Sequence, residues 1–236
     1  MEQDETIRPS VSVEIIGVSG AGKTALARLL TTALRANGHF AAQTRWFDEV
    51  DTTWSSRLRG TARALLDLVT LGPRLWQGQL DRGRLRRLRR GFHYAIAQRI
   101  LQSATNGWVI ISEPGWIMQL VGTAMQLGRI PAEADIFAFL RASTPDLLVV
   151  LDTAPEVAIS RMRGRNRGLP KQLRNLDCAE LTSKMICGRE TCRRIAQCAT
   201  ISGIQILTVE ASDSSAGAVA DGVANFLMAT LGPLLS

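Results

Sequence analysis

The sequence predicts one α/β domain in which a parallel sheet is covered by helices on both faces. Short apolar runs of strand length alternate with longer amphipathic segments along nearly the whole chain, and this alternation is typical of strand–helix–strand units. A glycine-rich turn also follows the first apolar run and precedes the first helical segment. Open α/β folds bind ligands at such positions. The 236 residues are enough for one large domain with a proper core.

The apolar pattern gives the elements in order. Strands are expected at 11–16, 39–44, 108–112, 147–151 and 204–209. Helices are expected after Gly22 up to the Asn37-Gly38 stop, then at 54–104 with breaks, 116–142, 156–163, 176–200 and 212–231. Pro131 is expected to open a second helix within 116–142. We therefore expect a disordered tail at 1–10 and a single domain at 11–236, with a helical, arginine-rich insertion at about 54–104 and a lid at about 161–175.

Composition favours a soluble protein with anionic partners. Hydrophobic residues make up 46% of the chain, no apolar run is long enough to cross a bilayer, and Met1 to Ser10 lack a signal-peptide core. A cytoplasmic location is therefore expected. Cys178, Cys187, Cys192 and Cys198 form no C-x-x-C pair, so we expect reduced thiols rather than a zinc site. The net charge of +7 suits nucleotides, phosphorylated metabolites, nucleic acid or a membrane surface.

The expected insertion combines an apolar stripe with a basic run. Leu58, Ala62, Leu65, Leu66 and Val69 recur at helical spacing, and residues 82–90 contain six arginines. The run is interpreted as a solvated helix face, a contact for a phosphate-rich substrate, or a contact for an anionic membrane surface. Specific nucleic-acid binding ranks last because no base-reading module is recognisable.

The turn between the first strand and helix fits the pattern G-x-x-x-x-G-K-[ST], from Gly17 to Thr24. Its glycines allow a tight turn whose N–H groups point at an anion, and the following helix adds its dipole. Lys23 can reach the terminal phosphates of a nucleotide, and the Thr24 hydroxyl can bind Mg²⁺. The nucleotide-binding candidates are Gly17, Val18, Ser19, Gly20, Ala21, Gly22, Lys23 and Thr24.

Acceptor-side candidates follow two other expected strands. Arg45, Phe47 and Asp48 come after the second strand, where ligands bind in open α/β folds; a solvated loop is the alternative. Glu113 ends the third strand and could orient Mg²⁺-bound water or accept a hydroxyl proton; a capping carboxylate is the alternative. Asp48 and Glu113 are thus the candidate catalytic carboxylates, and Thr24 and Glu113 the candidate metal ligands.

An arginine-rich segment follows the fourth strand and its helix. Arg161, Arg163 and Arg165 alternate with other residues and lead into Arg167. Such a segment suits a flexible cover that brings guanidinium groups onto a transferred phosphate; the alternative is a basic surface loop. Arg161 and Arg165 are the candidate catalytic arginines, and Arg163 a candidate nucleotide contact.

These motifs together resemble the thymidylate-kinase-like branch of P-loop kinases, over about residues 11 to 230. Besides the glycine-rich turn, Thr44-Arg45 falls at the family's T-R-E-P-G turn, and Gln98-Arg99 at its Asp/Asn-Arg pair. Residues 108–113 fall at its third strand and Asp-Arg-Tyr/His motif. Residues 148–158 follow its "L-D-x-x-P-E-x-A" turn, and 161–165 resemble the start of its lid.

The resemblance implies a three-layer α/β/α P-loop kinase fold with a five-stranded parallel sheet in the order 2-3-1-4-5. It also implies transfer of the γ-phosphoryl group of ATP, with Mg²⁺, to a small acceptor. Arg99 becomes a substrate-binding candidate on this basis, and we expect a homodimer.

Departures from the family fall on the acceptor side. Ser19 replaces an aspartate, Trp46-Phe47-Asp48 replaces Glu-Pro-Gly, and Glu113-Pro114 replaces Asp-Arg. The acceptor thus stays open among nucleotides, nucleosides, sugars and other metabolites. The alternative functions are a P-loop ATPase or GTPase switch acting on a macromolecule, and a degenerate nucleotide-binding protein.

Overall fold

The computed structural model describes residues 10–44, 96–102, 104–105, 107–143, 145–166, 168–170, 173–211 and 216–235, with isolated positions between 58 and 93. The described residues do not include Arg45, Phe47, Asp48, the arginine run at 82–90, or residues 1–9 of the tail expected at 1–10. The predictions made for them therefore stay predictions. Ser10 is described, and its hydroxyl lies 3.2 Å from that of Thr105, so the expected disorder does not extend to this residue.

A five-stranded parallel sheet forms the centre of the molecule. Its strands are β1 (Val11–Gly17), β2 (Ala41–Gln43), β3 (Val109–Ser112), β4 (Leu147–Asp152) and β5 (Gln205–Glu210). Their spatial order is β2-β3-β1-β4-β5, and every neighbouring pair is parallel. The predicted α/β class and strand order are thus confirmed.

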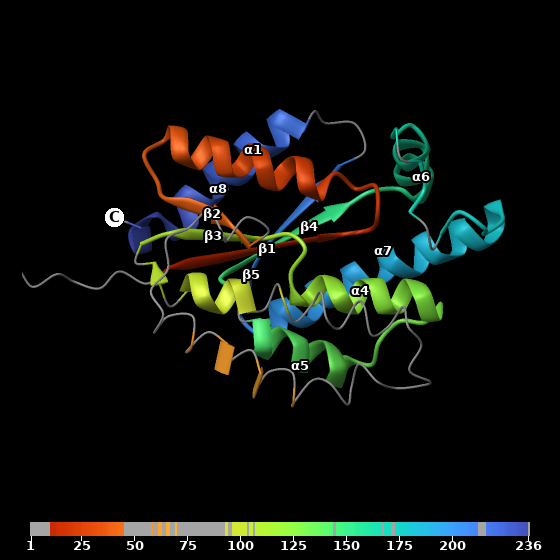
Figure 1. The fold of residues 1–236 in the computed structure, drawn as a ribbon, viewed down its shortest axis with the longest axis horizontal. Coiled ribbons are helices and arrows are strands. Elements are labelled where there is room, and N and C mark those ends of the chain that lie inside the picture. The colour runs from red at the N-terminus through yellow and green to blue at the C-terminus, as the bar shows by residue number, and fades with distance from the viewer. Residues whose placement is uncertain are drawn as a thin grey trace, which may run out of the picture.

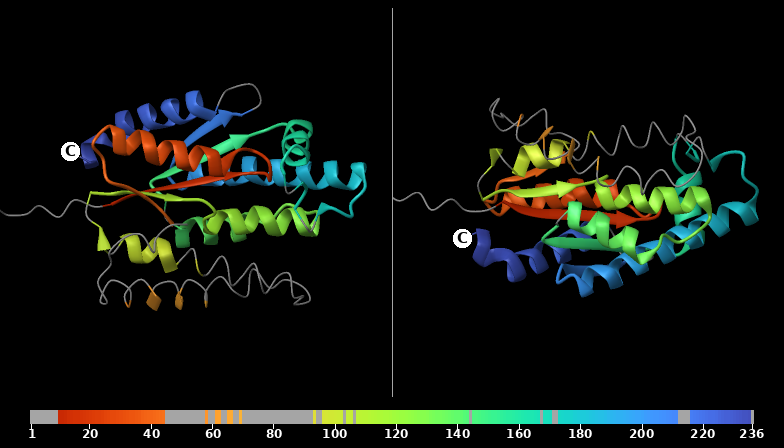
Figure 2. Two further views of the ribbon diagram at one scale, coloured as in Figure 1. Left: turned by 45° about the horizontal axis from the view of Figure 1, so that its top comes forward. Right: turned by 90° about the horizontal axis from the view of Figure 1, so that it is seen from below.

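Helices cover both faces of this sheet (Figures 1 and 2). One layer contains α1 (Lys23–Ala36) and α8 (Ala216–Leu235), and the opposite layer contains α4 (Trp116–Leu127), α5 (Glu133–Ser143) and α7 (Cys178–Ile201). The short helix α6 (Pro155–Arg163) stands beyond the carboxyl end of β4. Among the described helices, none is both long and apolar enough to cross a bilayer.

Burial follows position in the sheet. Strands β1 and β3 are buried at every residue, whereas β5 at the edge is partly exposed. This agrees with the continuous apolar runs expected of parallel strands covered on both faces. Cys192 and Cys198 line the core, Cys178 is exposed, and all four cysteines are free.

Two helices begin later than the sequence indicated, for identifiable reasons. Helix α5 begins at Glu133 because the Ala132 carbonyl accepts the N–H groups of Asp135 and Ile136; Pro131 therefore precedes the helix instead of opening it. Helix α7 begins at Cys178 because Asp177 and Glu180 form a reciprocal capping box.

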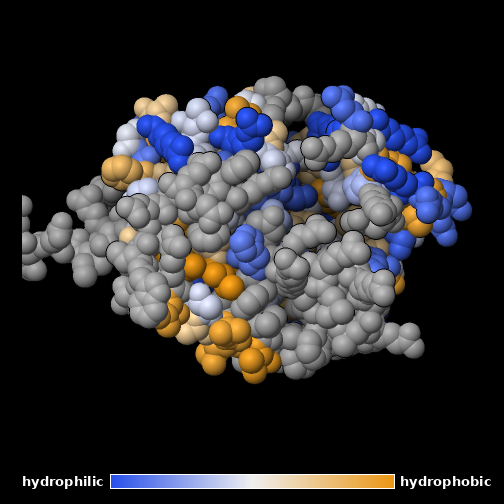
Figure 3. Space-filling view, viewed as in Figure 1, coloured by the Kyte–Doolittle hydropathy of each residue, from blue (hydrophilic) through white to orange (hydrophobic). Residues whose placement is uncertain are grey.

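The predicted apolar stripe lies at the surface where it is described. Exposed fractions are 48% for Leu58, 47% for Leu65, 68% for Leu66 and 73% for Val69. Figure 3 shows hydrophobic side chains along the lower edge of the molecule, where Figure 1 draws these helical segments. This stripe therefore does not contribute to the core.

Strand register places the glycine-rich loop (Gly17–Thr24) at the carboxyl edge of the sheet. Gly17, the last residue of β1, pairs with Leu151 of β4. Glu113, Asp152 and Ala211 stand at or just after the ends of the neighbouring strands. The candidate site is therefore built from segments that are distant in sequence but share this edge.

Candidate functional site

The glycine-rich loop is closed by its own lysine. Lys23 begins α1, and its Nζ donates hydrogen bonds to the carbonyl oxygens of Gly17 at 2.8 Å and Val18 at 2.9 Å. Burial lowers the pKa of Lys23, while the nearby Glu113 carboxylate acts in the opposite direction. The ammonium group is therefore held inside the loop, next to the N–H groups at the start of α1 that lack partners within the helix.

Two glycines of the loop adopt conformations that side chains disfavour. Gly20 has φ of 90° and Gly22 has φ of 97°, which glycine reaches without steric cost. A Cβ atom on Gly20 would also overlap the carbonyl oxygen of Ala158 in α6, whereas Gly22 has open space around it. Gly20 thus lets α6 pack directly on the loop.

Thr24 and Glu113 meet although 89 residues separate them. The Thr24 hydroxyl donates a 3.0 Å hydrogen bond to Oε2 of Glu113, which directly follows β3. Glu113 is only 7% exposed. The predicted metal ligands are therefore brought together, at the first turn of α1.

This oxygen pair fits Mg²⁺, which binds few protein ligands and keeps waters and substrate phosphates in its coordination shell. Within the described part of the chain, no three His, Cys, Asp or Glu side chains gather as a metal site. A metal ion here would thus depend on Thr24, Glu113 and the phosphates of a bound nucleotide.

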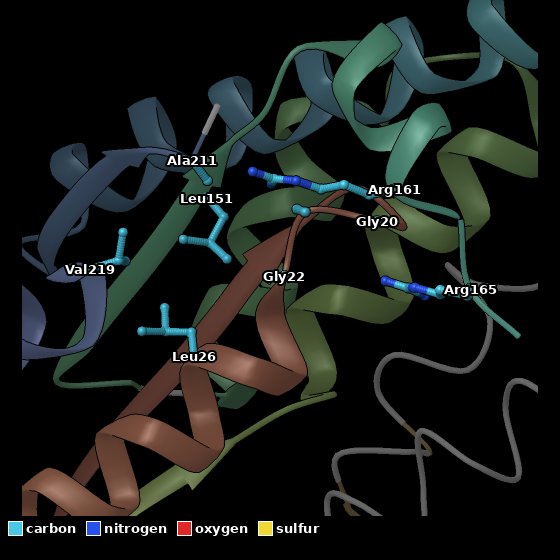
Figure 4. A pocket seen from close by; sticks show the side chains of 9 residues that line it. Gly20, Gly22, Leu26, Leu151, Arg161, Arg165, Ala211 and Val219 are labelled. Carbon is cyan, nitrogen blue, oxygen red and sulfur yellow. The ribbon is translucent and has the colours of Figure 1, made fainter. Parts of the chain in front are cut away.

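A pocket of about 250 Å³ opens beside the loop. Figure 4 shows Arg161, from the last turn of α6, extended over Gly20, and Arg165, from the following turn, directed toward the loop near Gly22. The remaining lining is mostly apolar and comes from Ala21, Leu26, Leu151, Ala211 and Val219. An apolar pocket with a few converging polar groups is typical of small-molecule sites.

The predicted arginine segment has two groups of side chains, because helix geometry points them in different directions. Arg161 and Arg165 line the pocket. Arg163 does not, and it is exposed, because it lies about 200° around the helix from Arg161. The predicted nucleotide contact at Arg163 is therefore not part of this pocket. Figure 3 shows strongly hydrophilic residues at the upper right of the molecule, where Figure 1 labels α6.

Arg99 lies at the opposite edge of the sheet. Its guanidinium group donates to the carbonyl oxygen of Ala142 near the end of α5, and to Oε1 of Gln102 at 3.3 Å. The adjacent Gln98 donates to Ser12 Oγ near the start of β1. Because the helical segment at 96–102 runs back to the amino end of β3, Arg99 faces away from the loop. Arg99 is thus not part of the pocket beside the glycine-rich loop, and the substrate contact expected of it stays a prediction.

Asp152 forms a charge cluster that the motifs did not indicate. Its carboxylate accepts hydrogen bonds from Nε of Arg189 and from Nη2 of Arg193 at 2.9 Å. Both arginines are on α7. Although burial alone would raise it, the pKa of Asp152 lies below its ordinary value because these two arginines favour the ionised form. The sequence showed the aspartate after the fourth strand but gave no signal for its partners.

A second unpredicted carboxylate lies inside the sheet. Glu14 in β1 is completely buried, and burial raises its pKa to about 7. It accepts a 2.5 Å hydrogen bond from Ser143 Oγ and a 3.2 Å hydrogen bond from the N–H of Met118 in the first turn of α4. Glu14 therefore caps the helix that begins just after Glu113.

Several buried polar groups without hydrogen-bond partners lie at the carboxyl edge of the sheet, where the glycine-rich loop also lies. Among the described residues, the buried hydroxyls of Thr44, Ser112 and Thr153 have no hydrogen-bond partner. They stand at or next to the carboxyl ends of β2, β3 and β4. Buried polar groups are usually satisfied by protein, water or ligand, so this edge has unused capacity for polar contacts.

Comparison with models of known protein families gave no match, and a search of curated proteins found no significantly similar sequence. The assignment of function therefore depends on the residues and geometry described above.

Proposed function

We propose that this protein is an ATP- and Mg²⁺-dependent phosphotransferase that moves the γ-phosphoryl group to a small-molecule acceptor. The observation that carries the proposal is the Thr24–Glu113 hydrogen bond of 3.0 Å beside Lys23. It joins the hydroxyl of a G-x-x-x-x-G-K-[ST] loop to a carboxylate just after the adjacent parallel strand. These are the groups needed to hold Mg²⁺ against nucleotide phosphates.

Each charged group has a distinct role in this proposal. Lys23 contacts the terminal phosphates and exchanges its carbonyl partners for phosphate oxygens. The N–H groups at the start of α1 bind the phosphate chain. Arg161 and Arg165 approach from the opposite side of the pocket and stabilise charge on the transferring group. When bound, Mg²⁺ supplies further neutralisation of phosphate charge.

The donor nucleotide fits the pocket by its chemistry. The apolar side chains of Leu26, Leu151, Ala211 and Val219 give a surface on which a base can pack. The same pocket is lined by Gly20, Ala21 and Gly22 of the glycine-rich loop, so contacts to the base and to the phosphates would be adjacent.

The two candidate carboxylates take different roles. Glu113 accepts a hydrogen bond from Thr24 Oγ1, which supports a role for Glu113 as a metal ligand. Asp48 is then the candidate base that accepts the proton of the acceptor hydroxyl, on the sequence prediction alone. The acceptor itself stays a class: a nucleotide, nucleoside, sugar or other hydroxyl-bearing metabolite.

Incubation with ATP, Mg²⁺ and a panel of candidate acceptors tests this proposal, with mass spectrometry to detect a phosphorylated product. We expect Lys23→Ala to lower kcat/KM by about 10²- to 10³-fold, because a charged contact to the transferring group is removed. Lys184→Ala is the matched control. Lys184 donates to the carbonyl oxygens of Met125 and Gln126 at the end of α4, so phosphate transfer should persist.

Other results would favour the alternatives. Nucleotide hydrolysis that is stimulated only by a macromolecule, with no phosphorylated small product, would favour an ATPase or GTPase switch. Nucleotide binding with neither transfer nor hydrolysis would favour a degenerate binding protein. Unchanged turnover of the true acceptor by Lys23→Ala would contradict the proposed role of the loop.

A further inference from the structure

Asp152 occupies a junction between the loop, the arginine-bearing helix and the pocket wall. Leu151 pairs with Gly17, the first residue of the glycine-rich loop, so Asp152 follows at the level of the loop itself. Helix α6 begins three residues later at Pro155. The main-chain oxygen of Asp152 accepts the N–H of Ala211, which lines the pocket.

The side chain of Asp152 connects this junction to α7. Oδ1 accepts from Nε of Arg189, and Oδ2 accepts from Nη2 of Arg193 at 2.9 Å and from its Nε at 3.3 Å. Arg189 and Arg193 are four residues apart and thus share one face of the helix. Both oxygens of the carboxylate are therefore used to hold a single helix.

Helix α7 in turn contacts the loop. A Cβ atom on Gly188 would lie 3.1 Å from Cγ1 of Val18. Cys192, between the two arginines in sequence, is buried in the core, and this burial raises the pKa of its thiol to about 12. Loop, α7 and the end of β4 thus pack as one unit.

Helix α6 rests on the same unit. Ala158 is packed on Gly20 with no space for a side chain there. The pKa of Arg189 is raised mainly by its hydrogen bond to Asp152, and the carboxylate of Glu156 in the first turn of α6 is the last of the negative charges that contribute. The last turn of α6 then carries Arg161 into the pocket, and Arg165 follows it. Any tilt of α6 at its start would displace both guanidinium groups.

We propose that Asp152, Arg189 and Arg193 form a clamp that positions α6, so that Arg161 and Arg165 are held over the glycine-rich loop. The three residues are positioning residues and act through Arg161 and Arg165. This role rests on the proposed phosphotransfer. The side chains are partly exposed, at 18% for Asp152, 28% for Arg189 and 48% for Arg193. Partly exposed ion pairs add little to global stability, so a variant of the clamp should fold.

Asp152→Asn tests the clamp on the full-length protein, with Arg194→Gln as a matched control. Arg194 is on the same helix and has its own ion pair, 2.5 Å from Glu133, away from Asp152. We expect hydrogen–deuterium exchange over residues 155–163 to rise at least several-fold in Asp152→Asn and to stay unchanged in Arg194→Gln. Unchanged exchange in Asp152→Asn would overturn the clamp, whether or not the protein transfers phosphate.

Kinetics separate positioning from a general loss of structure. We expect Asp152→Asn to lower kcat/KM about tenfold, and to have little further effect in an Arg161→Gln background, because residues that act through one another are not additive. Equal losses in both backgrounds would contradict the clamp. Arg189→Lys should keep more activity than Arg189→Gln.

Failure of the proposed function and failure of the clamp give different results. If the unmodified protein transfers no phosphate, the proposed function fails, and the exchange measurement still decides whether the clamp holds α6. If Asp152→Asn does not fold, Arg193→Gln replaces it. That variant removes one of the two arginines and leaves Arg189 on Asp152, so a smaller rise in exchange over α6 is expected, and its absence would overturn the clamp.

Discussion

Glu14 shows how a single buried charge can set the pH response of the molecule. Its carboxylate lies in the middle of β1, where Ser143 Oγ and the N–H of Met118 donate to it. Hydrogen bonds from these groups favour ionisation, but desolvation outweighs them and raises the pKa from 4.5 to about 7. The folded state therefore binds a proton at pH values where the unfolded chain has released it.

This difference predicts lower stability at alkaline pH. Because the folded pKa is the higher one, the stabilisation is fully present below pH 4.5 and is lost as pH rises through about 7. The shift corresponds to about 3 kcal/mol of unfolding free energy. Urea unfolding of the unmodified protein should thus give a lower midpoint at pH 8 than at pH 5.5.

Glu14→Gln should remove most of this slope while keeping the side-chain shape. A variant whose stability fell between pH 5.5 and 8 as steeply as that of the unmodified protein would show that another group is responsible.

The hydrogen bond between Thr24 and Glu113 is the central residue-to-residue contact of the proposed site. Neither residue is diagnostic alone, since a threonine often caps a helix and a carboxylate often ends a strand. Their 3.0 Å hydrogen bond joins α1 to the end of β3, and this pairing turns two separate sequence predictions into one candidate metal site.

At the scale of elements, the packing of α6 on the glycine-rich loop sets the entrance to the pocket. Gly20 is the point of closest approach, with φ of 90° and the Ala158 carbonyl oxygen where a Cβ would be. A side chain at this position would have an unfavourable backbone conformation, and its Cβ would overlap the carbonyl oxygen of Ala158.

Gly20→Ala should therefore displace α6 and lower ATP affinity by at least about tenfold, a cost of about 1.4 kcal/mol, as measured by isothermal titration calorimetry. Gly122→Ala is the control, because Gly122 lies inside α4 with open space where its Cβ would be. Alanine is the better helix former there, so affinity should not change. An unaffected affinity in Gly20→Ala would contradict the tight contact between α6 and the loop.

At the scale of the whole molecule, local patterns predicted the framework and failed where distant segments meet. Short apolar or partly apolar runs located all five strands, and the glycine-rich pattern located the loop, because both signals are contained in a few neighbouring residues. The pairing of Asp152 with Arg189 and Arg193 spans 37 and 41 residues, and α7 offers several arginines with no pattern that marks these two.

Two predicted site residues lie away from the pocket for a related reason. Arg99 matches the family motif by its order in the chain, yet it stands at the amino edge of the sheet because of the direction of the helix before β3. Arg163 was grouped with its neighbours by composition, yet helix geometry separates it from Arg161 and Arg165. The role of Glu14 could not be predicted from the sequence. A carboxylate within an apolar run does not show that the first turn of α4 packs on it and donates a hydrogen bond to it.

The most direct test of the central claim is Mg²⁺-dependent binding of ATP in a double-mutant cycle of Thr24 and Glu113. Calorimetry on the unmodified protein, Thr24→Ala, Glu113→Gln and the double variant would compare affinities with and without Mg²⁺. If the two residues hold one metal ion, each single change should lower Mg²⁺-dependent affinity by about 10- to 100-fold. The double change should then cost little more than either one. Affinity that does not depend on Mg²⁺, or losses that simply add, would contradict the proposed site.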